Sequence, residues 1–150
     1  MTGITTAPLT PTQRDLFLDA LRHPEDAAFN VAVSVSLPSR VEPGRWKQAL
    51  GKVVAGQDIN RTVFALRDGQ PCQVVSADMP AVFVNRYCPD WDDAAVRTFV
   101  EQTMAVPMDC GTGPLAKYFL IQKNSGDVAA VVASHLVMDR LTGVLLHEAV

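Results

Sequence analysis

The alternation of apolar and polar residues predicts helices and strands that follow one another closely along the chain. Residues 12–21 place apolar side chains at helical spacing, behind a capping box in which Thr10 is the N-cap and Gln13 its reciprocal partner. Pro11 suits the first helical position between them. Residues 29–37 alternate strictly between apolar and small or polar side chains, which predicts a strand with one buried face.

A second helix and a hairpin are predicted next. After Pro43, apolar residues recur at helical spacing until Gly56 ends the pattern. The segments 61–67 and 71–75 then flank the dipeptide Asp-Gly, which is a strong signal for a two-residue β-hairpin turn.

The second half of the chain repeats this alternation of element types. Residues 80–87 predict a strand, and residues 92–106 predict a helix whose acidic first turn suits the helix dipole. Residues 116–122 and 127–137 predict two strands joined by a turn, and the second is apolar enough to be a central strand buried on both faces. Residues 140–150 predict a last helix.

These elements define an α/β fold. Helices and strands are interleaved, but several connections between strands are too short for parallel crossovers. We therefore expect a two-layer sandwich, in which a mixed sheet is covered by helices. Because no cap ends the last predicted helix, we expect residues 1–150 to be part of a larger domain.

Composition narrows the classes of function. Apolar residues make up 48% of the chain and charged residues 19%, which is typical of a well-buried globular body. The net charge is −3 without a long basic run, which argues against nucleic-acid binding. No segment predicts a membrane span or a secretion signal, and the three cysteines are widely spaced. We expect a cytoplasmic protein with free thiols.

One histidine lies where chemistry is possible. His135 falls at the end of the apolar run 127–137, and a buried strand that ends there would deliver the imidazole to the open rim of a rigid sheet. A histidine at a strand end also has a plain structural reading. Asp139 likewise precedes the last predicted helix, where a carboxylate commonly caps exposed N–H groups.

The residues around His135 resemble a known sequence motif. SHLVMDR, residues 134–140, resembles the HHxxxDG motif of condensation domains from nonribosomal peptide synthetases, in the chloramphenicol acetyltransferase-like superfamily. Three further segments resemble motifs of that family in the same order. They are PLTPTQRDLFLDAL (8–21), VVAGQDINRTVFALRDGQPCQVV (53–75) and VPMDCGTGPLAKYFLI (106–121).

The resemblance implies a fold, a reaction and partners. Residues 1–150 would be the N-terminal lobe of a two-lobed domain, and the active site would lie between this lobe and the missing C-terminal lobe. Carrier proteins would deliver an acyl thioester donor and an amine acceptor on phosphopantetheine, so that the chain binds no cofactor directly. Residues 1–150 alone would be inactive. The initial Met1 would place the domain at the start of its polypeptide, with a donor from another protein or an acyl-CoA.

The resemblance also assigns roles to residues. His135 takes the position of the family's second motif histidine, a general base for the acceptor amine or a hydrogen-bonding partner of the transition state. Asp139 takes the position of a structural aspartate, for which Arg61 is the candidate ion-pair partner. No spacing of His147 and Glu148 with other residues supplies the three or four ligands of a metal site.

Two positions depart from the motif and keep other functions open. Ser134 replaces the first histidine, and Arg140 replaces a glycine. Arg140 would narrow the acceptor channel or bind an anionic substrate group, or it would begin a helix and point to solvent. The alternatives are therefore a catalytically degenerate domain that serves as a docking platform for a partner protein, or a related acyltransferase that makes esters.

Overall fold

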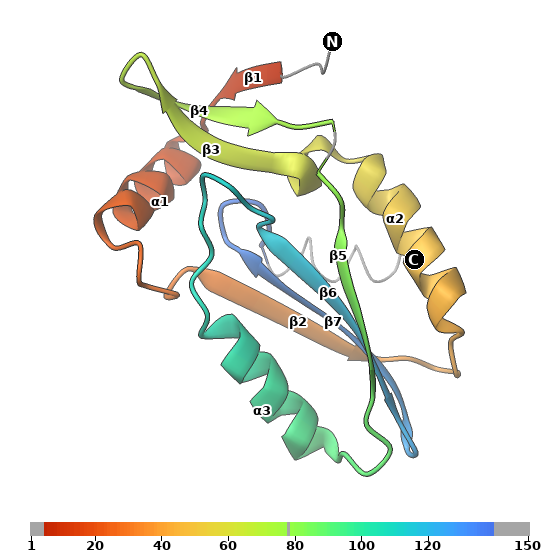
Figure 1. Cartoon of the computed structure of the whole chain (residues 1–150). Helices are drawn as coiled ribbons and strands as arrows, with labels where there is room; N and C mark the ends of the chain where they lie inside the picture. Colours follow the sequence, from red (N-terminus) through yellow and green to blue (C-terminus); the bar gives the residue numbers. More distant parts are fainter. Residues whose placement is uncertain (1–4, 78, 140–150) are drawn as a thin grey trace.

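The computed structural model describes residues 5–77 and 79–139, which form two β-sheets and three α-helices (Figure 1). The larger sheet contains β2 (Asn30–Ser36), β5 (Val82–Tyr87), β6 (Ala116–Lys123) and β7 (Gly126–Ser134). The smaller sheet contains β1 (Thr5–Pro8), β3 (Thr62–Arg67) and β4 (Gln70–Val75). The α-helices are α1 (Pro11–Arg22), α2 (Pro43–Ala55) and α3 (Asp93–Met104), and a short 3-10 helix, η1 (Asp58–Arg61), precedes β3.

The larger sheet is mixed, as the sequence predicts. Its strand order is β2-β7-β6-β5, with β7 antiparallel to both of its neighbours. β5 and β6 are parallel, and the chain between them forms the helix α3, which supplies the long connection that a parallel pair needs. The central position of β7 confirms the prediction of a strand buried on both faces, since its residues from Asp127 to Ser134 are all buried.

The predicted hairpin forms a separate sheet. β3 and β4 pair in antiparallel register through the turn at Asp68 and Gly69, whose φ angles of 50° and 74° fit the left-handed turn that Asp-Gly favours. β1 then adds to the free side of β4. The sequence analysis did not predict β1.

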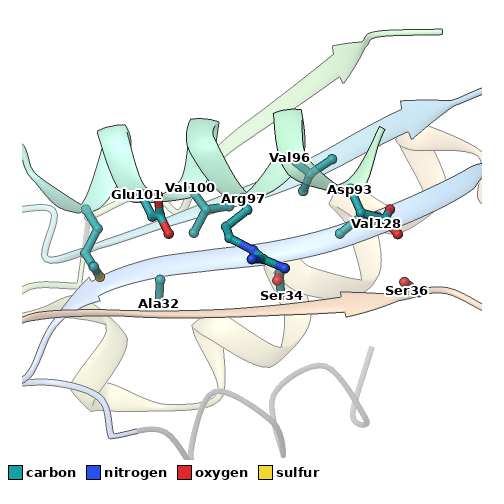
Figure 2. A pocket seen from close by; sticks show the side chains of 10 residues that line it. Ala32, Ser34, Ser36, Asp93, Val96, Arg97, Val100, Glu101 and Val128 are labelled. Carbon is teal, nitrogen blue, oxygen red and sulfur yellow. The ribbon is translucent and has the colours of Figure 1, made fainter. Parts of the chain in front are cut away.

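Helices cover both faces of the larger sheet, which adds a layer to the two that we expected. Successive residues of a strand point to opposite faces of the sheet, and β6 and β7 are buried almost without interruption. Both faces of the sheet therefore need other elements to cover them. On one face, Val96 and Val100 of α3 pack in a cluster with Phe119 and Val132. Figure 2 shows α3 lying across the sheet with both valines directed at the strands.

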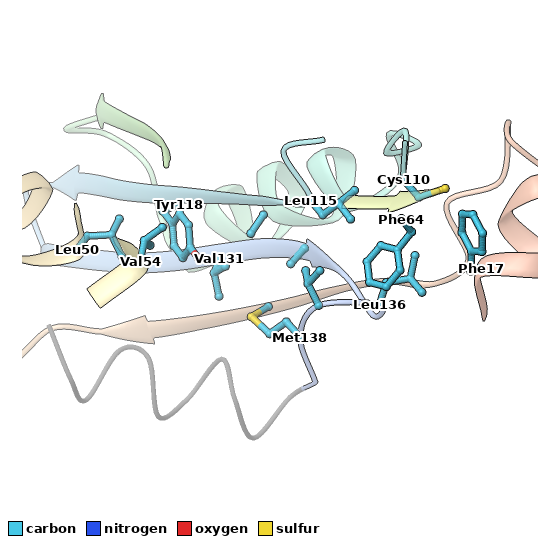
Figure 3. Close-up of a cluster of buried hydrophobic side chains, with 13 residues drawn as sticks. Phe17, Leu50, Val54, Phe64, Cys110, Leu115, Tyr118, Val131, Leu136 and Met138 are labelled. Atoms are coloured by element: carbon cyan, nitrogen blue, oxygen red, sulfur yellow. The ribbon is translucent and has the colours of Figure 1, made fainter. Parts of the chain in front are cut away.

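The other face carries the main core. Leu50 and Val54 of α2 pack there with Tyr118 and Val131. Phe17 of α1 and Phe64 of β3 extend the same cluster beyond the end of the sheet, with their ring centroids 6.0 Å apart (Figure 3). The main core therefore joins α1, α2, the larger sheet and the hairpin around the end of β7.

The first helix starts as its local sequence predicts. The Thr10 hydroxyl accepts from the Gln13 N–H and the Gln13 side chain accepts from the Thr10 N–H, which confirms the capping box.

In the described part of the chain, no helix is long and apolar enough to cross a membrane. The last predicted helix, 140–150, lies outside the described residues.

Candidate functional site

His135 lies directly after the last residue of β7. The strand was predicted to continue to residue 137, but it ends at Ser134 and the chain turns through residues 135–137. The His135 N–H donates to the carbonyl of Phe29, which precedes β2, at 2.7 Å. The residue itself is exposed while its neighbours on both sides are buried. The prediction of an imidazole at the rim of the sheet is confirmed.

The turn also orients the imidazole. Nδ1 of His135 lies 3.0 Å from the carbonyl oxygen of Met138. A carbonyl oxygen only accepts hydrogen bonds, so Nδ1 carries the proton of the neutral ring and donates. Nε2 is then the basic nitrogen, which is the arrangement that a general base requires.

Ser134 is a structural part of this turn. Its side chain is buried, and its hydroxyl accepts from the Leu136 N–H at 3.3 Å. Its carbonyl accepts from the N–H groups of Val137 and Met138 at 3.1 and 3.2 Å. The serine that replaces the first motif histidine therefore caps the chain reversal behind His135.

Apolar packing in the main core and a hydrogen bond from α1 hold the turn in place. Leu136 and Met138 are buried in the main core, in the same cluster as Phe17 and Phe64 (Figure 3). Nε2 of Gln13 donates to the carbonyl of Leu136 at 3.1 Å. His135 is thus the exposed member of a turn that is otherwise fixed in the core.

Arg61 ends η1, next to the smaller sheet. It donates through Nη1 to the Ser76 carbonyl at 3.2 Å and forms an ion pair with the exposed carboxylate of Asp58. Its Nε is buried without a hydrogen-bond partner in the part of the chain that the structure describes. The neighbouring Asn60 accepts from the Tyr118 hydroxyl at 3.2 Å, which attaches η1 to the larger sheet. Burial raises the pKa of Tyr118 from 10.0 to about 12.

The remaining motif residues lie beyond the turn. Asp139 is exposed and follows the buried Met138. Its ion pair with Arg61 stays a prediction. Arg140 lies outside the described residues. Whether it lines the acceptor channel or begins a helix and points to solvent therefore stays a prediction.

An acidic cluster at the start of α3 has local roles. Oδ1 of Asp92 accepts from the Ala95 N–H at 2.8 Å and caps the helix. The exposed Asp93 pairs at 2.5 Å with Lys123, whose side chain is almost fully buried. The carboxylate of Asp93 therefore compensates a buried ammonium group, and its pKa is lowered chiefly by the hydrogen bond from Lys123.

A cavity of about 350 Å³ lies between α3 and β2, lined by Ser34, Ser36, Arg97 and Glu101 among others (Figure 2). None of the four candidate site residues that the structure describes, Arg61, Ser134, His135 and Asp139, lines it. Among residues 5–77 and 79–139, no group of three His, Cys, Asp or Glu side chains is placed to hold a metal ion.

Comparison with known proteins identifies the family. The sequence model described as "Condensation domain" matches residues 4–148, so the chain belongs to the condensation domain family. The chain is 30% identical over 138 residues to nonribosomal peptide synthetase vlms of Lecanicillium sp, covering 88% of this chain and 2% of that protein. It is 25% identical over 143 residues to bacitracin synthase 3 of Bacillus licheniformis, covering 93% of this chain and 2% of that protein.

Solved structures show the same fold. The starter condensation domain of rhizomide synthetase RzmA matches with a TM-score of 0.85 and 22% identity, over 97% of this chain and 36% of that one. The first condensation domain of the CDA synthetase matches with a TM-score of 0.87 and 14% identity, over 97% and 39%. The chain thus spans little more than a third of these domains, and it corresponds to their N-terminal part.

The contacts that place the turn around His135 include three that could not be predicted from the sequence. They are the hydrogen bonds of Phe29, Met138 and Gln13 to the turn around His135. The first and second use backbone carbonyls, for which side-chain identity gives no signal. Gln13 was predicted as a helix cap, but its second hydrogen bond spans 123 positions of sequence.

Proposed function

We propose that this chain is the N-terminal lobe of an amide-forming condensation domain, in which His135 is the general base. The observation that carries the proposal is the single hydrogen bond between His135 Nδ1 and the Met138 carbonyl. It assigns the ring proton to Nδ1 and leaves the lone pair of Nε2 for the proton of a substrate. Membership of the condensation domain family supports this assignment.

The proposed reaction transfers an acyl group from a thioester to an amine. The amine nitrogen attacks the thioester carbonyl carbon while Nε2 of His135 accepts an amine proton. The C–S bond then breaks, and the proton passes to the departing thiolate, which leaves as a thiol. During the cycle the transient imidazolium keeps its Nδ1–H bond to the Met138 carbonyl, so the ring keeps its orientation.

The donor and the acceptor would arrive on phosphopantetheine arms of carrier proteins. Condensation domains of nonribosomal peptide synthetases work with carrier-bound substrates, and one such synthetase is among the relatives of this chain. One structure of the RzmA starter domain is a complex with C8-CoA. The exposed ring of His135 would face these substrates in a cleft completed by the C-terminal lobe. Residues 1–150 alone would therefore form no amide.

We propose that Asp139 and Arg61 form an ion pair that braces the end of the turn. Arg61 already lies on a segment fixed to the larger sheet by Asn60 and Tyr118. Phe64, three residues further on, packs in the same buried cluster as Met138, the residue before Asp139. The pair would thus connect two segments that the core already joins.

A second candidate function is a docking platform without catalysis, favoured by the two departures from the family motif. The first departure, Ser134, weakens that candidate. Its buried hydroxyl accepts from the Leu136 N–H and so helps to hold the turn that presents His135. Arg140 remains in its favour. An ester-forming acyltransferase differs from the leading proposal only in the acceptor.

The test uses the complete condensation domain with a carrier-bound acyl donor. Carrier-bound amines and alcohols are offered as acceptors in separate arms, and an acyl-CoA replaces the donor in another. We expect an amide product, lost in His135→Ala. An ester product alone would support the third candidate. A domain that binds its partner proteins but forms neither product would overturn the proposal in favour of docking.

A further inference from the structure

We infer that Gln13 is a positioning residue for His135, acting through the hydrogen bond from its Nε2 to the Leu136 carbonyl. The inference rests on the proposed role of His135 in catalysis. It assigns to the first turn of α1 a function in the reaction besides its function as a helix cap.

The Leu136 peptide is held on both sides. Its N–H donates to the Ser134 hydroxyl at 3.3 Å, and its carbonyl accepts from Gln13 at 3.1 Å. Leu136 is buried, so water does not readily replace a lost partner. This peptide lies between His135 and Met138, and the hydrogen bond between those two residues orients the imidazole ring. A shift of the Leu136 peptide therefore changes the distance from Nδ1 to the Met138 carbonyl.

The capping box fixes which end of the Gln13 amide faces the turn. Oε1 accepts from the Thr10 N–H at 3.1 Å, so Nε2 is the group left to donate to Leu136. The Thr10 hydroxyl separately accepts from the Gln13 N–H at 3.2 Å. Capping and positioning thus use different atoms, and substitutions can separate them.

Glutamate at position 13 separates the two functions most cleanly. Its carboxylate can accept from the Thr10 N–H, since glutamate is a favoured residue of capping boxes. It has no N–H to donate, and it would direct a negative charge at the Leu136 carbonyl. The matched control is Thr10→Ala, which removes a capping hydrogen bond and keeps the amide of Gln13.

The first measurement is the rate of amide formation by the complete domain. We expect Gln13→Glu to lower kcat by about tenfold, the effect of losing roughly one hydrogen bond to a buried group, with KM nearly unchanged. Thr10→Ala should keep kcat near the wild-type value while it lowers the melting temperature. Gln13→Met, which also lacks the donor but adds no charge, replaces Gln13→Glu if that variant does not fold.

The second measurement reads the imidazole itself and needs no turnover. The ¹⁵N chemical shifts of the ring nitrogens, recorded above about pH 8 where an ordinary histidine is neutral, report which nitrogen carries the proton. His135→Ala identifies the signals. We expect a protonated Nδ1 in wild type and in Thr10→Ala, and a mixture of tautomers in Gln13→Glu.

The two measurements distinguish failure of this inference from failure of the proposed function. Wild-type ring shifts in Gln13→Glu would overturn the inference, whether or not kcat falls, since Gln13 would then not act through the turn. If the wild-type domain forms no amide, the proposed function fails, and the ring shifts alone decide whether Gln13 positions His135.

Discussion

Nδ1 of His135 lies 3.0 Å from the carbonyl oxygen of Met138, three residues further along the same turn. The turn that exposes the imidazole therefore also fixes its tautomer. Leu136, Val137 and Met138 are all buried, so the backbone of the turn, with the Met138 carbonyl that the ring contacts, cannot shift without disturbing core packing. Rigid placement of this kind is what a catalytic base requires.

Asp127 supports the opposite end of β7 and gives the first prediction. Its side chain is fully buried and accepts from Arg40 Nη1 at 2.6 Å and from the Val41 N–H at 2.9 Å. We expect Asp127→Ala to lower the free energy of unfolding by about 2 kcal/mol, because the Val41 N–H loses its acceptor and Arg40, whose side chain is 55% exposed, loses its ion pair. Urea unfolding followed by tryptophan fluorescence measures the change.

The control for that substitution is Asp15→Ala, on the exposed side of α1. It should change the free energy of unfolding by no more than about 0.5 kcal/mol. If Asp127→Ala were as stable as this control, the buried carboxylate would not stabilise the strand.

The loop before β6 gives a prediction on pH. The Gly111 N–H and the Thr112 hydroxyl donate to Asp109 and lower the pKa of its carboxyl below its ordinary value of 3.8. A carboxyl whose pKa is lowered by folding stabilises the protein above its unfolded pKa, and this contribution is lost as the pH falls toward the folded pKa. The wild type should therefore lose stability below about pH 4 more steeply than Asp109→Asn.

Urea unfolding of both proteins at a series of pH values checks this. The free energy of unfolding should differ most near neutral pH, and the difference should shrink as the solution becomes acidic. A difference that is constant with pH would show that the charge of Asp109 does not matter.

The acidic cluster before α3 gives a prediction that separates stability from catalysis. Because Asp92 caps the helix, Asp92→Ala should cost about 1 kcal/mol of stability. The rate of amide formation by the complete domain should not change at a temperature where the variant is folded. Asp90→Ala, at an exposed position just outside the helix, is the control and should affect neither quantity. A loss of rate in Asp92→Ala alone would give this carboxylate a chemical role.

The sequence predicted most of those features that depend on neighbouring residues. Thr10 and Gln13 form the predicted capping box because their side chains reach backbone groups within three positions. The acidic start of α3 was predicted too, although Asp92 caps the helix instead of opening it. The Asp68-Gly69 turn formed for an equally local reason. These contacts can be predicted from short patterns because no distant segment is needed to make them.

Features that depend on distant segments were missed or misplaced. β1 carries no apolar alternation, and it forms because β4 offers a free edge for backbone pairing. Leu136 and Val137 extended the apolar pattern of β7, but they are buried in a turn instead of a strand. Apolar patterning indicates burial and does not show how the backbone reaches it.

The proposed general-base role of His135 is tested most directly by single-turnover amide formation in the complete domain, with wild type and His135→Ala compared at saturating acceptor. We expect the substitution to slow the acyl transfer by at least about 100-fold, within the range of general-base catalysis. Added imidazole should restore part of the rate, since it supplies the missing base. Amide formation by His135→Ala at the wild-type rate would contradict the account.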